Sequence, residues 1–218
     1  MRTYSPKPRY RLNTRGKILL AVIAAVAAAL VLLAIFYEEP PKDPAFLYDV
    51  AVPEWVDADY IDMDVNARKG ALLEEVGGVV VHYVANPGTT AAQNRSYFNN
   101  AGTAVNSHFI IGLDGEVVQC VPLYEQSVAS NDRNRDTISI EVCHPDESGK
   151  FTDASYNSLV RLAGWLSAVC GFKKDDIIRH YDVTEKLCPK YFVEHEDAWK
   201  QFKKEVMESK KAFLKEDS

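Results

Sequence analysis

The sequence lacks the cysteine pattern of a small disulfide-stabilised protein. It contains four cysteines in 218 residues, and no two of them have the CxxC spacing. Secreted mini-domains use cysteine far more densely, so that class of protein is excluded. Internal repeats and low-complexity tracts are also missing, which leaves one globular domain with additional segments as the expectation. Cys120 and Cys143 lie in apolar runs and are predicted to be buried free thiols.

Positive charge is scarce outside the N-terminus. The chain carries 25 basic and 31 acidic residues, a formal net charge of −6. Six of the basic residues lie within residues 1–17, which contain no acidic residue, so the remainder has a net charge of −12. A nucleic-acid partner requires a basic face for its phosphates. Nucleic acid is therefore not expected to bind this protein.

Residues 18–36 contain no charged or strongly polar side chain. A helix of that length, at about 1.5 Å per residue, can cross a hydrocarbon core of roughly 30 Å. Basic residues precede the run and Glu38 and Glu39 follow it, which predicts a cytoplasmic N-terminus. A cleaved signal peptide and a buried core helix are the alternatives. The length of the run and the lack of a small-x-small cleavage site favour an uncleaved anchor.

These features divide the chain into five predicted parts. The predicted location is the cell membrane, with a single span and an extracytoplasmic globular domain. The parts are a basic cytoplasmic tail over residues 1–17, a transmembrane anchor over 18–37, a proline- and acid-rich stalk over 38–65, a globular domain over 66–208 and a frayed tail over 209–218.

The globular region mixes strand and helix signals. Apolar runs rich in β-branched residues predict buried strands over 79–84 and 137–143, and Asp114-Gly115 predicts a hairpin turn. Helices are predicted over 90–100, 152–170 and 194–213, on periodicity and capping residues. This pattern predicts an α/β fold, with a central mixed β-sheet flanked by helices and a single N-terminal transmembrane helix before it.

Residues 177–192, with the sequence IIRHYDVTEKLCPKYF, concentrate groups that suit a metal site. His180 and Cys188 are side chains that zinc prefers, and a catalytic zinc usually takes three protein ligands and a water. His82, at the end of an apolar strand, ranks first as the third ligand, and His108 ranks second. A single strand histidine is more often structural, so the spacing alone leaves this choice open.

Glu141 lies within an apolar strand run. Burying a carboxylate without a partner costs several kcal/mol or raises its pKa. It is therefore either a functional group or the buried partner of an arginine such as Arg179. Lys186 is likewise either functional or simply exposed to solvent. Asn86, Asn106 and Arg135 are able to hydrogen-bond a glycan or peptide, but the same residue types also form loops.

Four motifs follow one another along the globular region. They are VVVHYVANPG at 79–88, SHFIIGLDGEVVQCVPL at 107–123, DTISIEVCHP at 136–145 and RHYDVTEKLCPKYF at 179–192. With these motifs, from about residue 66 to 202, the chain resembles the zinc-dependent N-acetylmuramoyl-L-alanine amidases of the Amidase-2 type, which include phage amidase endolysins and peptidoglycan recognition proteins. The motifs occur in the order found in that family.

The resemblance implies that His82, His180 and Cys188 bind Zn²⁺ and that Glu141 is the general acid/base. Zinc would lower the pKa of its water toward roughly 7, and zinc with Lys186 would stabilise the oxyanion. The implied substrate is peptidoglycan, cut at the amide between the lactyl group of N-acetylmuramic acid and L-alanine. Residues 66–208 would then be the amidase catalytic domain.

Some relatives use a tyrosine just before the His-Phe pair of the hairpin strand, but Ser107 occupies that position here, which favours Glu141 for the acid/base role.

Two other functions remain open at this stage. A non-catalytic peptidoglycan-binding module is the first alternative, although such relatives typically lack the cysteine ligand that Cys188 provides. A zinc peptidase acting on stem peptides is the second.

Overall fold

The structure is a computed structural model that describes residues 13–36, 42–64 and 67–216. Contacts divide the chain into two compact units, residues 1–40 and 41–218.

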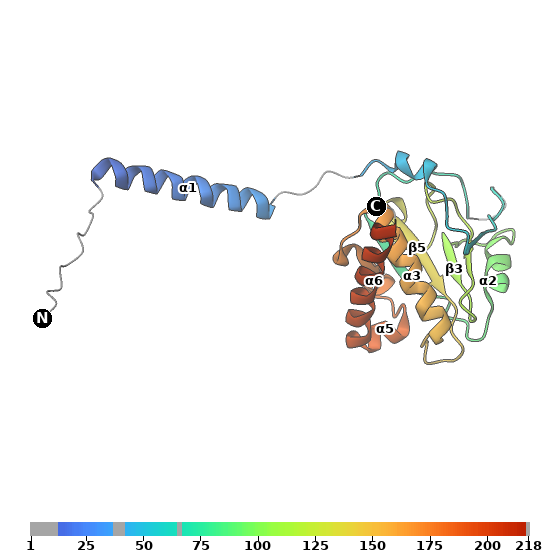
Figure 1. Cartoon of the computed structure of the whole chain (residues 1–218). Helices are drawn as coiled ribbons and strands as arrows, with labels where there is room; N and C mark the ends of the chain where they lie inside the picture. The colour runs from blue at the N-terminus through green and yellow to red at the C-terminus, as the bar shows by residue number, and fades with distance from the viewer. Residues whose placement is uncertain (1–12, 37–41, 65–66, 217–218) are drawn as a thin grey trace, which may run out of the picture. The chain divides into compact units, whose positions relative to one another are not determined.

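The first unit contains the helix α1 (Thr14–Phe36), drawn in blue in Figure 1. Its stretch Thr14–Leu32 is long and apolar enough to cross a membrane, judged by length and composition, and none of that stretch is buried. The helix covers the described part of the anchor predicted over 18–37. Most of the basic tail predicted over 1–17 lies outside the described residues, because these begin at residue 13.

The second unit is built on a six-stranded mixed sheet with the strand order β1-β4-β3-β5-β2-β6. The neighbours β3 and β4 are antiparallel, as the predicted hairpin requires, and the other neighbouring pairs are parallel. The strands are β1 (Val56–Ala58), β2 (Gly78–Tyr83), β3 (Phe109–Ile111), β4 (Val117–Gln119), β5 (Thr137–Val142) and β6 (Ile177–Arg179).

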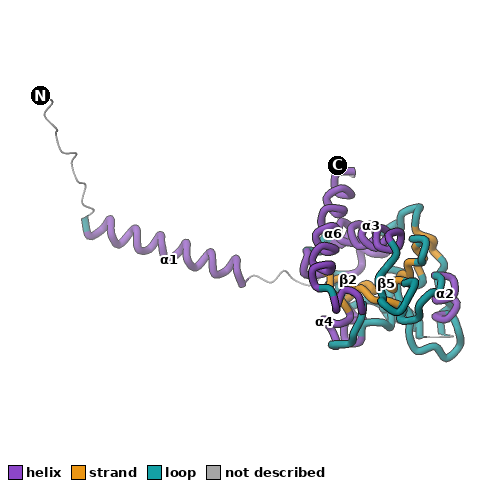
Figure 2. Tube along the Cα trace, turned by 90° about the horizontal axis from the view of Figure 1, so that it is seen from below, coloured by secondary structure: helices purple, strands orange, loops and turns teal. Residues whose placement is uncertain are grey.

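Helices cover both faces of this sheet. Figure 1 shows α3 and α6 on one side and α2 on the other, and Figure 2 shows α3 and α6 side by side. The central mixed sheet flanked by helices that the sequence predicts is thus confirmed. The helices are α2 (Ala91–Phe98), α3 (Asp153–Cys170), α4 (His180–Thr184), α5 (Lys190–Glu194) and α6 (Glu196–Glu216), and short 3-10 helices lie at Pro44–Asp49, Asn131–Arg135 and Lys174–Asp176.

Alternation along the strands assigns side chains to the two faces. In β2, Val79 and Val81 belong to the main hydrophobic core, which α3, α5 and α6 cover. In β5, Ile140 belongs to the same core. His82 follows Val81, and Glu141 follows Ile140, so both side chains lie on the opposite face, and the parallel register pairs them. The periodicity of two apolar strands therefore places two polar side chains next to each other.

Local signals set the predicted helix ends. Thr90 caps α2 by accepting a hydrogen bond from the Gln93 backbone N–H, in a capping box. Thr152 caps α3 by accepting a hydrogen bond from the Ser155 backbone N–H, and Gly171, with φ of 71°, ends this helix in the left-handed conformation that favours glycine. These boundaries agree with the predicted helices to within two residues.

The predicted stalk over 38–65 differs from the structure in its described part. Leu47, Val56 and Ile61 are buried, and β1 adds an edge strand beside β4. The folded unit therefore includes residues that precede the predicted boundary at residue 66, because their apolar side chains complete the core. Residues 38–41 and 65 lie outside the described residues.

The helix predicted over 194–213 is α6, which continues three residues further, to residue 216. It therefore covers most of residues 209–218, the tail that was predicted to fray, and Phe213 packs against the main core. The cysteine prediction is confirmed, because Cys120 and Cys143 are buried free thiols.

Candidate active site

The sheet face opposite the main core carries polar side chains at the carboxyl ends of three neighbouring parallel strands, β5, β2 and β6. His82 in β2 pairs in register with Glu141 in β5. Arg179, the last residue of β6, pairs with Val81, so the next residue, His180, begins α4 beside His82. In α/β sheets, ligands commonly bind outside the carboxyl ends of the strands.

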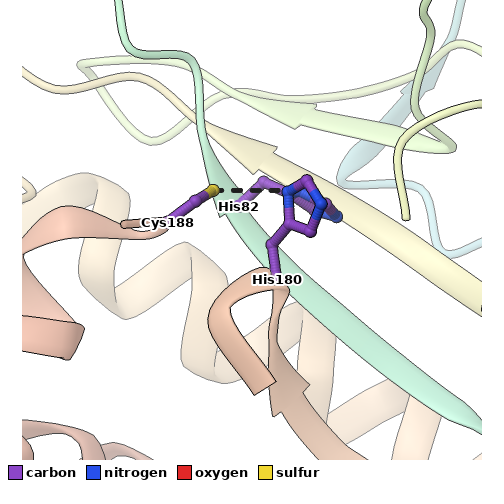
Figure 3. Close-up of side chains that lie close together, drawn as sticks. All are labelled: His82, His180 and Cys188. Carbon is purple, nitrogen blue, oxygen red and sulfur yellow. Dashed lines mark hydrogen bonds between the residues drawn. The ribbon is translucent and has the colours of Figure 1, made fainter. Parts of the chain in front are cut away.

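His82, His180 and Cys188 form a compact buried cluster (Figure 3). One ligand atom from each lies within 4.8 Å of the others. His82 Nδ1 is 3.8 Å from Cys188 Sγ, and the two imidazole ring centroids are 4.6 Å apart. The chain turns back after α4 at Glu185, which has φ of 61°, and the backbone N–H of Tyr181 donates to the Cys188 carbonyl oxygen at 2.8 Å. This turn brings the thiol to the histidines.

This cluster fits a tetrahedral zinc ion. Zinc bonds of about 2.0–2.3 Å to nitrogen and sulfur place tetrahedral ligand atoms roughly 3.5 Å apart. Burial raises the pKa of the Cys188 thiol to about 12, and burial, with His180 and Lys186 nearby, lowers the pKa of His82 well below its usual value. A divalent cation reverses the cost of a buried thiolate, because its charge stabilises the anion. Neutral imidazoles are the form that binds metal.

The outer nitrogens of both imidazoles have partners in a single loop, residues 127–136, which contains the 3-10 helix Asn131–Arg135. His82 Nε2 lies 3.1 Å from Ser130 Oγ, and His180 Nε2 lies 3.0 Å from Asn131 Oδ1. Neither Ser130 nor Asn131 was predicted as a site residue from the sequence. Their only local signal is the polar composition of the loop before β5, which many surface loops share.

Glu141 lies in the wall of the same cavity as the cluster. Its Oε2 is buried and has no hydrogen-bond partner among the residues that the structure describes. Burial raises the pKa of Glu141 to about 8, and the positive charge of Lys186 opposes part of this shift. The carboxyl group is therefore available to a bound molecule.

The alternative that pairs Glu141 with Arg179 is wrong. The Arg179 guanidinium binds the carboxylates of Asp182 and Glu196, each at 2.8 Å. Arg179 pairs in register with Val81, which faces the main core, whereas Glu141 lies on the other face. The sheet itself thus separates the two charges.

Lys186 is exposed and lines the cavity. Its positive charge helps to lower the pKa of both His82 and His180. The ammonium group therefore acts on the same small region as the metal-binding cluster and the Glu141 carboxyl.

His108, the second-ranked third ligand, lies outside the cluster. It is fully buried, its Nε2 lies 2.8 Å from the Glu125 carbonyl oxygen, and its Nδ1 accepts a hydrogen bond from the Ser139 backbone N–H at 3.0 Å. Burial lowers the pKa of His108 to about 4. His108 therefore has a structural role and does not belong to the metal-binding cluster.

The cavity has a volume of about 250 Å³. Asn106 lines it, and the buried Nδ2 of that residue lacks a hydrogen-bond partner within the described part of the chain. Asn86 lines a neighbouring cavity, and the two cavities share Val84, Asn94 and Tyr97. Arg135 is in neither cavity lining and lies 3.7 Å from Glu74. Of the three residues considered for hydrogen bonds to glycan or peptide, two therefore lie along one continuous region.

The chain is similar in sequence to known amidases. Residues 73–191 match the model of the family Amidase_2, described as N-acetylmuramoyl-L-alanine amidase. The N-acetylmuramoyl-L-alanine amidase CwlL of Bacillus licheniformis is 28% identical over 164 residues, and the amidase BlyA of Bacillus subtilis (strain 168) is 30% identical over 168 residues. Each alignment covers 67% of this chain and 45% of the relative.

The fold of this chain matches almost the whole of a solved endolysin structure. A mutant endolysin from Bacillus subtilis superposes with a TM-score of 0.61 and 25% identity, over 69% of this chain and 97% of the endolysin chain. The chain thus spans less than half the length of the curated relatives but nearly all of that endolysin structure. Because the family model matches more than half of its residues, this chain belongs to the Amidase_2 family of N-acetylmuramoyl-L-alanine amidases.

Proposed function

We propose that this protein is a zinc-dependent N-acetylmuramoyl-L-alanine amidase, anchored in a membrane by α1. Its substrate is peptidoglycan, and the bond that it hydrolyses joins the lactyl group of N-acetylmuramic acid to L-alanine. The observation that carries the proposal is the His82–His180–Cys188 cluster with Glu141 in the same cavity, in a chain of the amidase family.

His82, His180 and Cys188 would hold the zinc ion through two imidazole nitrogens and one thiolate. When bound, zinc supplies a Lewis acid that polarises a carbonyl group and lowers the pKa of water toward roughly 7. The buried thiolate offsets one of the two positive charges of the ion, and the two neutral imidazoles keep the site cationic.

Glu141 acts as the general base and then as the general acid. Its carboxylate takes a proton from the attacking water as the oxygen bonds to the lactyl carbonyl carbon. The protonated carboxyl then gives this proton to the nitrogen of L-alanine as the C–N bond breaks. A pKa raised toward 8 suits both steps near neutral pH, because neither protonation state is strongly disfavoured.

Lys186 stabilises the negative charge that develops on the carbonyl oxygen. Its ammonium group lies on the cavity wall and is exposed in the free protein, so a substrate can approach it. Loss of one such donor commonly reduces turnover by about 10²–10³-fold.

The acidic balance of the chain outside residues 1–17 is compatible with an extracytoplasmic enzyme, and α1 supports the membrane anchor. The basic residues before α1 favour a cytoplasmic N-terminus under the positive-inside rule. The amidase domain would then face the peptidoglycan layer.

The test is a digestion of purified peptidoglycan by the full chain in detergent, with and without zinc. We expect new L-alanine N-termini in the zinc-loaded sample, and their loss after chelation and in Cys188→Ser. A zinc-loaded protein that binds muropeptides but releases no N-termini would instead indicate a binding module. Cleavage within the stem peptide, read by mass spectrometry, would indicate a peptidase.

A further inference from the structure

We infer that Ser130 and Asn131, two consecutive residues of the loop before β5, are positioning residues that set the tautomer and orientation of both zinc-binding histidines. The inference rests on the proposed zinc site. It adds a function for a loop that none of the family motifs quoted from the sequence includes.

The chemistry of the contact partners fixes which nitrogen each ring presents. Asn131 Oδ1 can only accept, so His180 Nε2 must carry the hydrogen at 3.0 Å and leave the Nδ1 lone pair free. In His82, Nδ1 is the nitrogen beside Cys188 Sγ, so Nε2 carries the hydrogen and Ser130 Oγ accepts it at 3.1 Å. Both rings thus present Nδ1 to the metal. Outer partners of this kind hold the ring and raise its basicity as a ligand.

Hydrogen bonds and an ion pair within the loop hold Ser130 and Asn131 in place. The Asn134 side chain accepts from the backbone N–H groups of Ala129 and Ser130, at 3.0 and 2.6 Å. Arg133 Nε lies within 2.9 Å of both carboxylate oxygens of Asp136. Ser130 itself is fully buried. The two side chains that meet the imidazoles therefore have little freedom to move away.

The backbone of Asn131 explains why an asparagine suits this position. Its φ is 53°, in the left-handed region that few residues other than glycine tolerate. Asparagine is one of those few, and it also supplies the acceptor oxygen. Glycine would keep the backbone and remove the acceptor, whereas aspartate would keep both.

These properties define a matched set of variants in the full chain. Asn131→Gly and Ser130→Ala each remove one contact, and Asn131→Asp restores the acceptor at His180. Asp132→Gly places a glycine in the same loop next to Asn131 and leaves both contacts in place, so it controls for loop flexibility. The measurement is zinc affinity by competition with a chromogenic chelator in detergent, together with histidine ¹⁵N chemical shifts, which report the tautomer.

We expect Asn131→Gly and Ser130→Ala to weaken zinc binding by about 10–100-fold each. The zinc affinities of Asn131→Asp and Asp132→Gly should stay within about threefold of that of the parent chain. The ¹⁵N signals should shift only for His180 in Asn131→Gly and only for His82 in Ser130→Ala. The zinc-free melting temperature of Asn131→Gly should not fall, because glycine relieves the left-handed backbone.

Parent-like affinity in both contact-removing variants would overturn the inference, and so would an equal loss in Asp132→Gly, which would indicate loop rigidity alone. An Asn131→Asp variant as weak as Asn131→Gly would also overturn it. A parent chain that takes up no zinc contradicts the proposed function itself, so the two failures can be told apart.

Discussion

Glu141 shows how a single carboxyl group acquires unusual properties from its strand. The alternation of β5 turns it away from the main core, and its register partner is His82. Its Oε2 is buried without a partner in the described part of the chain, an arrangement that costs stability unless a proton or a ligand occupies it. Orphaned buried carboxyl groups of this kind are typical of active sites.

The first prediction concerns turnover. Glu141→Gln keeps the size of the side chain and removes its ability to take a proton, so amide hydrolysis should fall by about 10²–10⁴-fold. Zinc content, measured by elemental analysis, should stay unchanged, because the three proposed ligands remain. Glu54→Gln, at an exposed position, serves as the control. Activity of Glu141→Gln near that of the parent would assign the base to another group.

The second prediction concerns stability and pH in the zinc-free protein. The pKa of Glu141 rises from 4.5 to about 8 on folding, so between these values the folded chain keeps a proton that the unfolded chain has lost. This contribution to stability is complete below pH 4.5 and is lost as the pH rises through 8. The free energy of unfolding of the parent should therefore fall, relative to Glu141→Gln, by at most about 1.4 kcal/mol per pH unit.

Urea unfolding at pH 5, 6, 7 and 8 with a chelator present measures this difference. The lowered pKa of His82 gives the opposite slope, but His82 is present in both proteins and its effect cancels in the comparison. Parallel curves for the two proteins would mean that Glu141 titrates normally.

At the scale of elements, the segment from β6 to α6 is held together by Arg179. The guanidinium donates to Asp182 at the start of α4, to the Phe192 carbonyl oxygen of α5 and to Glu196 at the start of α6. One buried cation thus orients the elements that carry His180 and Cys188. Arg179, the strand residue before the proposed ligand His180, therefore acts on the other face of the sheet.

The third prediction tests this arrangement. Arg179→Met should lower the free energy of unfolding by about 2–3 kcal/mol, near the low end for a broken buried ion pair, because Glu196 is 52% exposed. Arg135→Met is the matched control, since Arg135 and Glu74 are 62% and 63% exposed and their pair is weak. Chemical unfolding of both variants gives the comparison. Equal small losses would show that Arg179 does not hold these elements together.

The structure of the segment before β2, the predicted stalk, depends on its packing against distant parts of the chain. Its four prolines and acidic residues are typical of an extended linker, yet β1 pairs with β4, and Ile61 is 1% exposed. Arg68 adds a bidentate contact to Glu125 at 2.8 Å. The composition of a segment does not reveal that a sheet edge elsewhere in the chain is free to pair with it.

At the scale of the whole molecule, two units have separate roles in the proposed function. The amidase unit provides the site, and α1 supplies the attachment to a membrane. The net charge follows the same division, because six basic residues precede the apolar run and the acidic excess follows it.

The fourth prediction tests the anchor. The full chain should sediment with membranes and resist extraction at high salt and high pH. The double substitution Val22→Lys and Val26→Lys puts two charges on one face of α1, each at a cost of roughly 3 kcal/mol in the membrane centre, so the extractable fraction should rise. A Val22→Leu and Val26→Leu pair should behave like the parent. Complete extraction of the parent chain at high salt would contradict a spanning helix.

The sequence by itself determined the features that depend on neighbouring residues. The apolar β-branched runs in residues 79–84 and 137–143, the helical periodicity that ends at Gly171 and the Asp114-Gly115 turn all act within a few positions of the chain, and the structure confirms the strands, the helix end and the hairpin that they predict. The four motifs also indicated the family, and the family model matches residues 73–191.

Only the tertiary structure decided which distant groups meet. Ser130 and Asn131 reach histidines that lie 48 and 49 positions away, and Arg179 selects Asp182 and Glu196 instead of Glu141. These choices follow from strand register and from the face of the sheet on which each side chain lies. Local patterns fix alternation within a strand, whereas the order of the strands, and therefore the neighbours of each side chain, depends on how the whole sheet buries its apolar surface.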